Sequence, residues 1–241
     1  MPVTDDIEGA SSLMHALERL SEDIVSCGRC PRLVAWRERV AEEKVRRFAQ
    51  ETYWGKPLSG FGDAHAQLVI VGLAPAAHGG NRTGRMFTGD SSADWLVHAL
   101  YVNGFANQPH SVASNDGLAL RNAYVTAAVR CAPPQNKPTA EEVQACRPYL
   151  EAELRILAPR VIVALGRVAF QAVRHYLKIS GSDQRSLIFK HGAQFDLELP
   201  SHSLTLIASY HPSRQNTQTG KLTVTMFNDI FQSARAILES P

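Results

Sequence analysis

Four short apolar runs rich in β-branched residues recur along the chain, and stretches with helical periodicity separate them. Apolar runs of this length are typical of strands buried on both faces of a parallel sheet. They occupy residues 68–72, 123–129, 161–166 and 204–209. The helical stretches cover residues 94–102, 141–157 and 168–177. This alternation predicts an α/β fold in which crossover helices cover both faces of a parallel sheet.

Two further predicted elements lie outside that alternation. Residues 11–24 place leucines and Ile24 at three-to-four spacing, which predicts an amphipathic helix with Ser11 or Ser12 as its N-cap. Residues 189–199, with a turn at His191-Gly192, predict an antiparallel hairpin beside the parallel core.

A second N-terminal helix is expected over residues 32–50, and it carries a run of charges. Glu42 with Arg46, and Glu43 with Arg47, would form i,i+4 pairs on its surface. We therefore expect a solvated face here in preference to a DNA-binding patch.

The bulk composition narrows the function classes only modestly. A length of 241 residues fits a single domain over residues 1–241, and the net charge of +2 neither requires nor excludes a polyanionic partner. No apolar stretch approaches the roughly 20 residues that span a bilayer, and the start of the chain, with Asp5 and Asp6, lacks a basic signal-peptide region. We expect a cytoplasmic protein that does not enter membranes.

The four cysteines have the spacing of a metal site. Cys27 and Cys30 form a C-x2-C pair beside a proline, and Cys131 and Cys146 flank a proline-rich loop. Cytosolic thiols stay reduced, so ligands or buried thiols are more plausible than disulfides. Four thiolates suit either zinc or a 4Fe-4S cluster, and four unrelated buried thiols remain the alternative.

Polar, glycine-rich chemistry follows the first apolar run, in the segment GLAPAAHGGNRTGRMFTGD at residues 72–90. Its central glycines can turn sharply and aim backbone N–H groups at a ligand, but the segment matches neither the Walker nor the dinucleotide pattern. Phe87 offers a stacking face unless it is a core residue. Asp90 offers a carboxylate, although capping the helix that follows is the simpler role for it.

A second polar segment, SYHPSRQNTQTG at residues 209–220, follows the last apolar run. Ligands of parallel α/β sheets bind outside the carboxyl ends of the strands, so the two segments are expected to wall one pocket. His211 belongs to this segment, and taken alone it could equally be a packed or surface histidine.

These two segments, the run YVTAAVRCAPPQNKPT at residues 124–139, the WGKPLSGFGD approach at residues 54–63 and the four cysteines together resemble the type-B, family-5 uracil-DNA glycosylases. The resemblance covers residues 27–223. It implies a three-layer α/β/α sandwich around a four-stranded parallel sheet, and a 4Fe-4S cluster on Cys27, Cys30, Cys131 and Cys146 that ties down the N-terminal helices. It also implies a DNA repair enzyme that flips a deaminated base out of the duplex and excises it. The sequence does not determine the oligomeric state, and a monomer that clamps DNA is the simplest expectation.

The resemblance also assigns roles to individual residues. His211 would stabilise the departing base, as a neutral or a cationic imidazole. Asp90 would manage the attacking water with help from Asn136, which is otherwise a turn residue before a proline, because Leu73 and Ala74 occupy positions where other branches carry a carboxylate or amide. Substrate contacts are implied for Phe87, Gly72, Ala74, Ala127, Gly80 and Asn81.

Base range and DNA contacts follow from the same resemblance. Family-4 enzymes read uracil with an asparagine where this chain has Ala127, so we expect activity on hypoxanthine, xanthine and thymine opposite guanine as well as uracil. The candidates for DNA contacts are Arg82, Arg85, Lys137, Arg214 and Gln215, the last two as a wedge into the gap left by the flipped nucleotide.

Two alternatives from other classes remain on the sequence alone. A non-catalytic binder of damaged DNA or nucleotides would use the same pocket, although the carboxylate of Asp90 would then be superfluous. An iron-sulfur electron-transfer protein would leave the two polar loops without a role.

Overall fold

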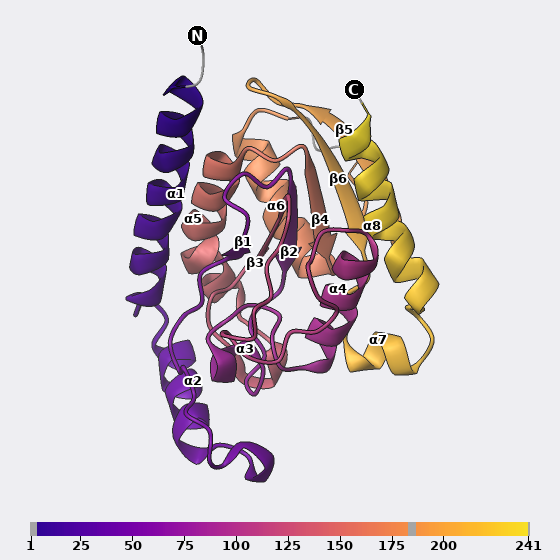
Figure 1. Cartoon of the computed structure of the whole chain (residues 1–241). Helices are drawn as coiled ribbons and strands as arrows, with labels where there is room; N and C mark the ends of the chain where they lie inside the picture. The colour runs from indigo at the N-terminus through magenta and orange to yellow at the C-terminus, as the bar shows by residue number, and fades with distance from the viewer. Residues whose placement is uncertain (1–3, 183–186, 241) are drawn as a thin grey trace.

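The short apolar runs form the centre of a six-stranded sheet in the computed structural model, which describes residues 4–182 and 187–240 (Figure 1). The strand order is β1-β3-β2-β4-β6-β5. The four central strands are parallel, as the sequence predicts, whereas β1 and β5 run antiparallel along the two edges. The strands are β1 (Phe61–Gly62), β2 (Leu68–Gly72), β3 (Ala123–Ala127), β4 (Val161–Leu165), β5 (Gln194–Glu198) and β6 (Ser203–Ser209).

Helices cover both faces of the sheet and confirm the α/β expectation, with two more strands than the four that the resemblance implies. One face packs against α4 and α8, the other against α5 and α6, and α1 lies outside α5 (Figure 1). The helices are α1 (Thr4–Val25), α2 (Pro31–Glu43), α3 (Gly80–Thr83), α4 (Ser91–Val102), α5 (Ala140–Leu157), α6 (Arg167–Ile179), α7 (Arg214–Gln218) and α8 (Val224–Glu239), with short 3-10 turns η1 (Arg46–Phe48) and η2 (Pro134–Asn136).

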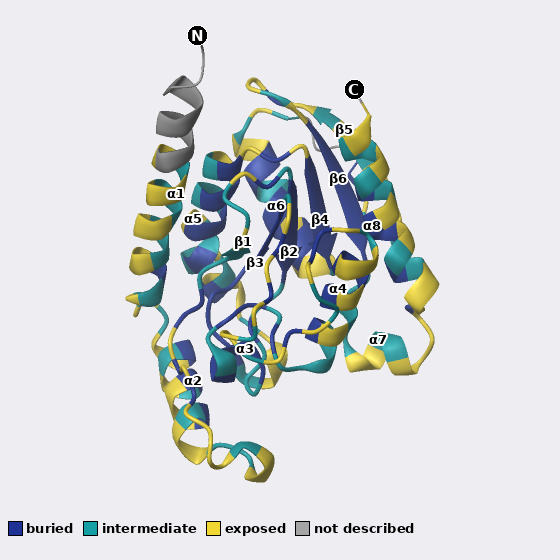
Figure 2. Cartoon of the chain, viewed as in Figure 1, coloured by how far each residue is buried: buried dark blue, intermediate teal, exposed yellow. Residues whose placement is uncertain are grey.

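The core sits on both sides of the central strands. Every residue of β2, β3 and β4 is buried, and Figure 2 shows these strands enclosed between the helical layers. Burying a side chain such as Ile70 contributes about 1.5 to 3 kcal/mol, so the four central strands account for much of the apolar stabilisation. No helix in the described part of the chain is both long and apolar enough to cross a bilayer.

The predicted hairpin at residues 189–199 is wrong. Residues 189–193 form no strand, and β5 pairs instead with β6 through a turn in which the Leu199 N–H donates to the His202 carbonyl. The alternation of exposed and half-buried positions in β5 belongs to an edge strand with one face in solvent. The sequence identified the strand but not its partner.

The boundaries of the two N-terminal helices also differ from the expectation. Helix α1 begins at Thr4, so Ser11 and Ser12 lie inside it and neither is at its N-terminus. Helix α2 ends at Glu43 because Lys44 adopts a left-handed conformation with φ of 52°. No glycine or proline marks this end, which is why the periodicity extends past it.

A buried ion pair joins α5 to the end of β3. Arg130 and Glu153 are both almost fully buried, and Arg130 Nη1 donates to Glu153 Oε1 at 3.0 Å. The same carboxylate accepts from Thr126 Oγ1 at 2.5 Å and from the Gly60 N–H at 3.1 Å. Removing one partner of such a pair costs about 3 to 5 kcal/mol, because the other charge is left buried and alone.

Candidate active site

The loop after β2 builds one wall of a site at the carboxyl edge of the sheet. Phe87 has a φ of 46°, a left-handed conformation that is unfavourable for a bulky residue. A Cβ on Gly72 would lie 2.7 Å from the Phe87 ring, so the absence of a side chain there makes room for the ring. Ala127 pairs with Gly72 across the parallel ladder. Three predicted substrate-contacting residues therefore lie together at the ends of β2 and β3.

Asp90 is the N-cap of α4, as the simpler interpretation of the sequence proposed. Its Oδ1 accepts hydrogen bonds from the N–H groups of Ser92 at 2.8 Å and Ala93 at 3.0 Å. Its Oδ2 faces Gly79, where a Cβ would lie only 2.1 Å away. Oδ2 accepts no hydrogen bond from any residue that the structure describes. Capping therefore uses one carboxylate oxygen and leaves the other for a water or ligand.

Burial raises the pKa of Asp90, against the lowering effect of the two capping hydrogen bonds. Arg214 lies close enough to lower the pKa as well, whereas Asp94 raises it. A carboxylate with an elevated pKa is a better proton acceptor than an exposed aspartate once it is ionised. This environment is compatible with the predicted role in handling water.

His211 lies opposite Phe87, in the loop that follows β6. The centroids of the two rings are 6.2 Å apart, with an angle of 31° between the ring planes. Gly166, at the end of β4, leaves room for it, because a Cβ there would lie 3.3 Å from the His211 Cβ. Burial lowers the pKa of His211 to about 4, so its imidazole is neutral near pH 7. A neutral imidazole still donates one N–H to a ligand.

Side-chain hydrogen bonds fasten the two loops to each other. Ser92 Oγ donates to the Pro212 carbonyl at 3.0 Å, and Arg214 Nε donates to Ser91 Oγ at 3.3 Å. Both serines belong to the first turn of α4, which Asp90 caps. The structure thus brings Asp90, His211 and Phe87 together, although they come from segments more than 120 residues apart.

His191 supports the His211 loop, a role that the sequence analysis missed. Its Nδ1 accepts the backbone N–H of Tyr210 at 3.0 Å, and its ring stacks on Tyr210 with centroids 4.9 Å apart. Burial lowers the pKa of His191, which keeps Nδ1 free to accept. No sequence signal identifies this contact, since it depends on where the loop before β5 meets the end of β6.

Asn136 and Lys137 occupy the loop after β3, at the same edge of the sheet. Both side chains are exposed, and Asn136 has a left-handed backbone with φ of 56°. The Lys137 carbonyl accepts from Arg32 Nη2 at 3.2 Å. Among the described residues no hydrogen bond or ion pair joins either side chain to Asp90 or His211, so the assisting role of Asn136 stays a prediction.

Arg82 and Arg85, expected at the DNA surface, are buried inside the protein. Arg82 pairs with Glu51 and donates to the carbonyls of His78 and Gly89. The Arg85 guanidinium is held by the carboxylate of Asp116 at 2.8 Å, by two hydroxyls and by a carbonyl. Their donors are committed to protein groups, so neither guanidinium is placed to bind phosphate.

The ion pair of Arg85 with Asp116 holds the pocket loop against the loop between α4 and β3. Burial alone would raise the pKa of Asp116, but hydrogen bonds from the Leu118 N–H, Arg85 and two further N–H groups lower it to about 2. The pair is therefore charged throughout the physiological pH range.

The remaining predicted contacts also lie in packed surroundings. Asn81 is fully buried and its Nδ2 donates to the Arg37 carbonyl at 3.1 Å. A Cβ on Gly80 would lie 3.1 Å from the side chains of Leu58 and Pro75. Ala74 packs against the cluster that contains the cysteines. These three positions shape the loop, and a direct substrate contact from them stays a prediction.

All four cysteines line one small cavity that is open in part to solvent. Cys27 follows α1, Cys30 is the N-cap of α2, Cys131 follows β3 and Cys146 lies in α5. Among the described residues no three potential ligands stand at metal-binding distances, so ligand geometry is not shown. The donor set nevertheless fits a thiophilic group, because four sulfurs and no carboxylate face the same space.

Two N–H donors point at the sulfurs of this cavity. Arg37 Nη1 donates to Cys131 Sγ at 3.1 Å, and the Arg130 backbone N–H donates to Cys146 Sγ at 3.2 Å. Burial raises the pKa of the Cys146 thiol to about 12. Hydrogen bonds of this kind are typical around the sulfur ligands of iron-sulfur clusters.

Comparison with known proteins decides the family. The model of the uracil DNA glycosylase superfamily matches residues 59–235. The chain belongs to the uracil DNA glycosylase superfamily.

Within the superfamily the chain is similar to both type-5 and type-4 uracil-DNA glycosylases, at different levels of identity. It is 48% identical to the type-5 uracil-DNA glycosylase of Pyrobaculum aerophilum, over 88% of this chain and 89% of that protein. The type-5 enzyme of Thermus thermophilus is also 48% identical, over 91% of this chain and 97% of that protein. A type-4 uracil-DNA glycosylase of Pyrobaculum aerophilum is 29% identical over 82% of this chain. The family resemblance seen in the sequence is confirmed.

The desolvation of the half-buried His211 imidazole gives a testable pH dependence. The pKa of His211 falls from about 6.5 in the unfolded chain to about 4 in the folded protein. Between pH 4 and pH 6.5 the unfolded state therefore binds more protons than the folded state. We expect the contribution of His211 to stability to be complete above pH 6.5 and to be lost as the pH falls to about 4. Urea unfolding of His211→Gln should show a slope of stability against pH that is shallower by about 1.4 kcal/mol per unit near pH 5.

His65→Gln, which removes an exposed histidine, is the matched control for this experiment. NMR titration of the His211 ring protons gives a direct reading. A ring that titrates near pH 6.5 in the folded protein would contradict the assignment of a desolvated, neutral imidazole.

Proposed function

We propose that this protein is a uracil-DNA glycosylase that hydrolyses the N-glycosidic bond of uracil in DNA and leaves an abasic site. The observation that carries the proposal is the meeting of Phe87, Asp90 and His211 at one edge of the sheet, in a chain 48% identical to two type-5 enzymes. The glycosidic carbon cannot be reached inside the base stack, so the target nucleotide must be flipped out of the duplex.

Each of the three residues meets one requirement of this reaction. Bond cleavage puts negative charge on the departing base and oxocarbenium-like positive charge on the sugar. His211, as a neutral donor, would hydrogen-bond to a carbonyl oxygen of the base as its charge develops. Oδ2 of Asp90 would orient the water that adds to the sugar carbon and would accept its proton. Phe87 would stack on the flipped base.

Contacts with DNA outside the pocket would come from exposed polar groups at the same edge. Lys137, Arg214 and Gln215 are exposed there and remain our candidates. Arg82 and Arg85 are withdrawn from this role because their guanidinium groups are buried and bonded internally.

We also propose that the four cysteines hold a 4Fe-4S cluster. Bound in their cavity, the cluster would act as a structural brace that joins α1 and α2 to the loop after β3 and to α5. Support comes from four cysteines in a lining that holds no carboxylate, from the two N–H donors and from the similarity to type-5 enzymes. Redox chemistry is not needed for hydrolysis of a glycosidic bond.

The decisive test of the activity compares the protein with Asp90→Asn on a duplex carrying uracil opposite guanine. Asparagine caps helices about as well as aspartate, so we expect the free energy of unfolding to change by only a few tenths of a kcal/mol. Single-turnover excision should fall about 10²- to 10⁴-fold, because the proton acceptor is lost.

Asp90→Ala is the control for capping, and it should cost about 1 kcal/mol of stability as well. Abasic sites are measured by strand cleavage in alkali. Full excision by Asp90→Asn would remove Asp90 from the mechanism, whereas damaged-DNA binding without any excision by the unaltered protein would favour the non-catalytic alternative.

The range of bases should depend on Ala127. Its side chain offers no hydrogen bond to the base edge, so we expect excision of hypoxanthine, xanthine and thymine opposite guanine in addition to uracil. Introducing Ala127→Asn should increase the preference for uracil over hypoxanthine. Relative excision rates on matched duplexes measure this, and an unchanged ratio would show that Ala127 does not set the range.

The cluster is tested by metal content. The purified protein should hold about four iron and four acid-labile sulfide per chain, and Cys131→Ser should reduce both together with the thermal stability. Zinc without sulfide would instead indicate a tetrahedral zinc site.

A further inference from the structure

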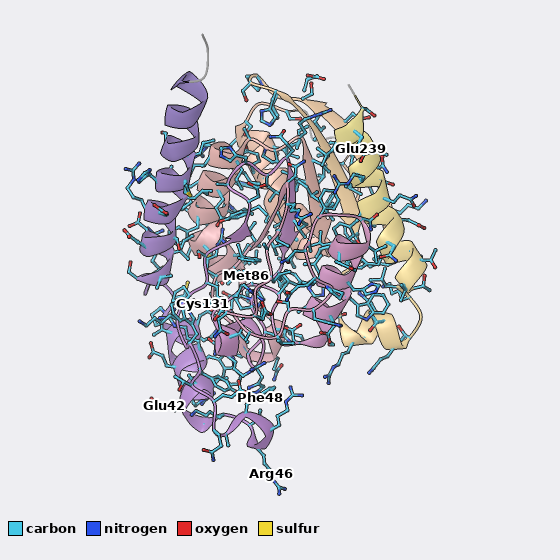
Figure 3. The ribbon with its side chains drawn as sticks, in the orientation of Figure 1. Glu42, Arg46, Phe48, Met86, Cys131 and Glu239 are labelled. Atoms are coloured by element: carbon cyan, nitrogen blue, oxygen red, sulfur yellow. The ribbon has the colours of Figure 1, made fainter. Side chains whose placement is uncertain are left out.

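The segment between α2 and β1 projects from the lower end of the molecule as a basic tip. Residues 44–56, which we call the arm, carry four cations and one acid. Figure 3 shows Arg46 at the outermost point of this tip, directed away from the body of the protein. Arg46, Arg47 and Lys56 are exposed, and Lys44 is half-buried.

These cations have no carboxylate partners within the described ranges. The i,i+4 pairs that the sequence predicts with Glu42 and Glu43 do not form, because α2 ends before Arg46 and Arg47. The one acid of the arm, Glu51, pairs with the buried Arg82. The positive charge of the tip is therefore available to a partner from solution. Had the expected pairs with Glu42 and Glu43 formed, they would have neutralised that charge.

The arm is fastened to the loop that carries Phe87 and Asp90. Its backbone donates twice to α3, from Trp54 N–H to the Arg82 carbonyl at 3.0 Å and from Gly55 N–H to the Asn81 carbonyl at 3.1 Å. Tyr53 Oη lies 3.1 Å from His78 Nδ1 in the same loop. The arm thus keeps a fixed position relative to the pocket.

Phe48 completes the attachment from the other side. The guanidinium carbon of Arg82 lies 3.9 Å from its ring centroid, and that of Arg47 lies 4.4 Å from it. Arg82 is buried beneath the ring, whereas Arg47 is exposed. This arrangement explains why Arg82 belongs to the glycine-rich segment without reaching DNA: it holds an arm that carries other cations.

The arm lies at the end of the molecule where the candidate site opens. Figure 1 shows α3, α7 and the chain that follows α2 at the same lower end, beyond the carboxyl ends of the parallel strands. Trp54 adds an exposed aromatic face, 40% accessible, with Lys56 Nζ 5.6 Å from its ring centroid. Cations interleaved with aromatic rings are typical of surfaces that bind nucleic-acid backbones.

We propose that the arm binds the phosphate backbone of the duplex that flanks the flipped nucleotide. The contact is electrostatic and independent of sequence, and it fixes the position of the pocket on the DNA. This inference rests on the proposed function, since it takes duplex DNA as the substrate.

The test measures binding of Arg46→Gln/Arg47→Gln to two duplexes that contain uracil: a long one, and one trimmed to a few base pairs on each side of the lesion. Losing two phosphate contacts should weaken binding to the long duplex by at least about tenfold near 0.1 M salt, and should reduce the slope of log K against log salt by about 2. The ratio of affinities for the long and trimmed duplexes should fall by a similar factor.

Arg121→Gln/Arg155→Gln is the matched control, because it removes the same charge from exposed positions beside the amino ends of the strands. It should keep the wild-type ratio and slope. Arg46→Gln alone preserves the stacking of Arg47 on Phe48 and should give about half of the effect on the slope. The proposal is overturned if the arm variant matches the control, or if its loss is equal on the two duplexes.

Failure of the arm and failure of the proposed function are distinguishable. Binding to an undamaged long duplex reports on the arm whether or not any base is excised. Excision by the unaltered protein together with control-like binding of the arm variant would refute the arm alone. Arm-dependent binding without excision would support the arm and refute the glycosylase activity.

Discussion

Four parallel strands that end at one edge of the sheet are the constraint on which the rest of the structure depends. Strands β3, β2, β4 and β6 are joined in a single parallel ladder. The segments that follow them therefore emerge side by side, however far apart they lie in the sequence. Phe87 after β2 and His211 after β6 meet for this reason, and the glycines at the ends of β2 and β4 provide the space between them.

The polar loops at this edge owe their shape to buried charges. Arg85 is held by Asp116, Arg82 by Glu51, and Arg130 by Glu153, and each of these guanidinium groups is buried. A buried cation needs its full set of partners, so each one fixes the segments that provide them. The exposed cations near this edge include Lys137 after β3, Arg214 after β6 and those of the arm.

The cysteine cavity lies next to the buried ion pair of Arg130 with Glu153. Arg130 connects the two, since its side chain binds Glu153 while its backbone N–H donates to Cys146. The link between α1 and α2 contributes two of the four cysteines, and α2 leads directly into the arm. A group bound by the four sulfurs would therefore stabilise the base of the arm as well as the loop after β3.

The sequence by itself determined the parallel core, the crossover helices, the cysteine set and the family, because apolar runs, helical periodicity and long motifs are local properties of the chain. It also offered two roles for Asp90, as a helix cap and as the carboxylate that handles water; the structure shows that Oδ1 caps α4, and that Oδ2 accepts no hydrogen bond from the described residues. Only the tertiary structure decided that Arg82 and Arg85 are buried, that β5 pairs with β6, that α2 stops at Glu43 and that His191 supports Tyr210. These outcomes depend on contacts between segments distant in sequence, and a side chain's charge does not reveal whether its partner will be another side chain or a ligand.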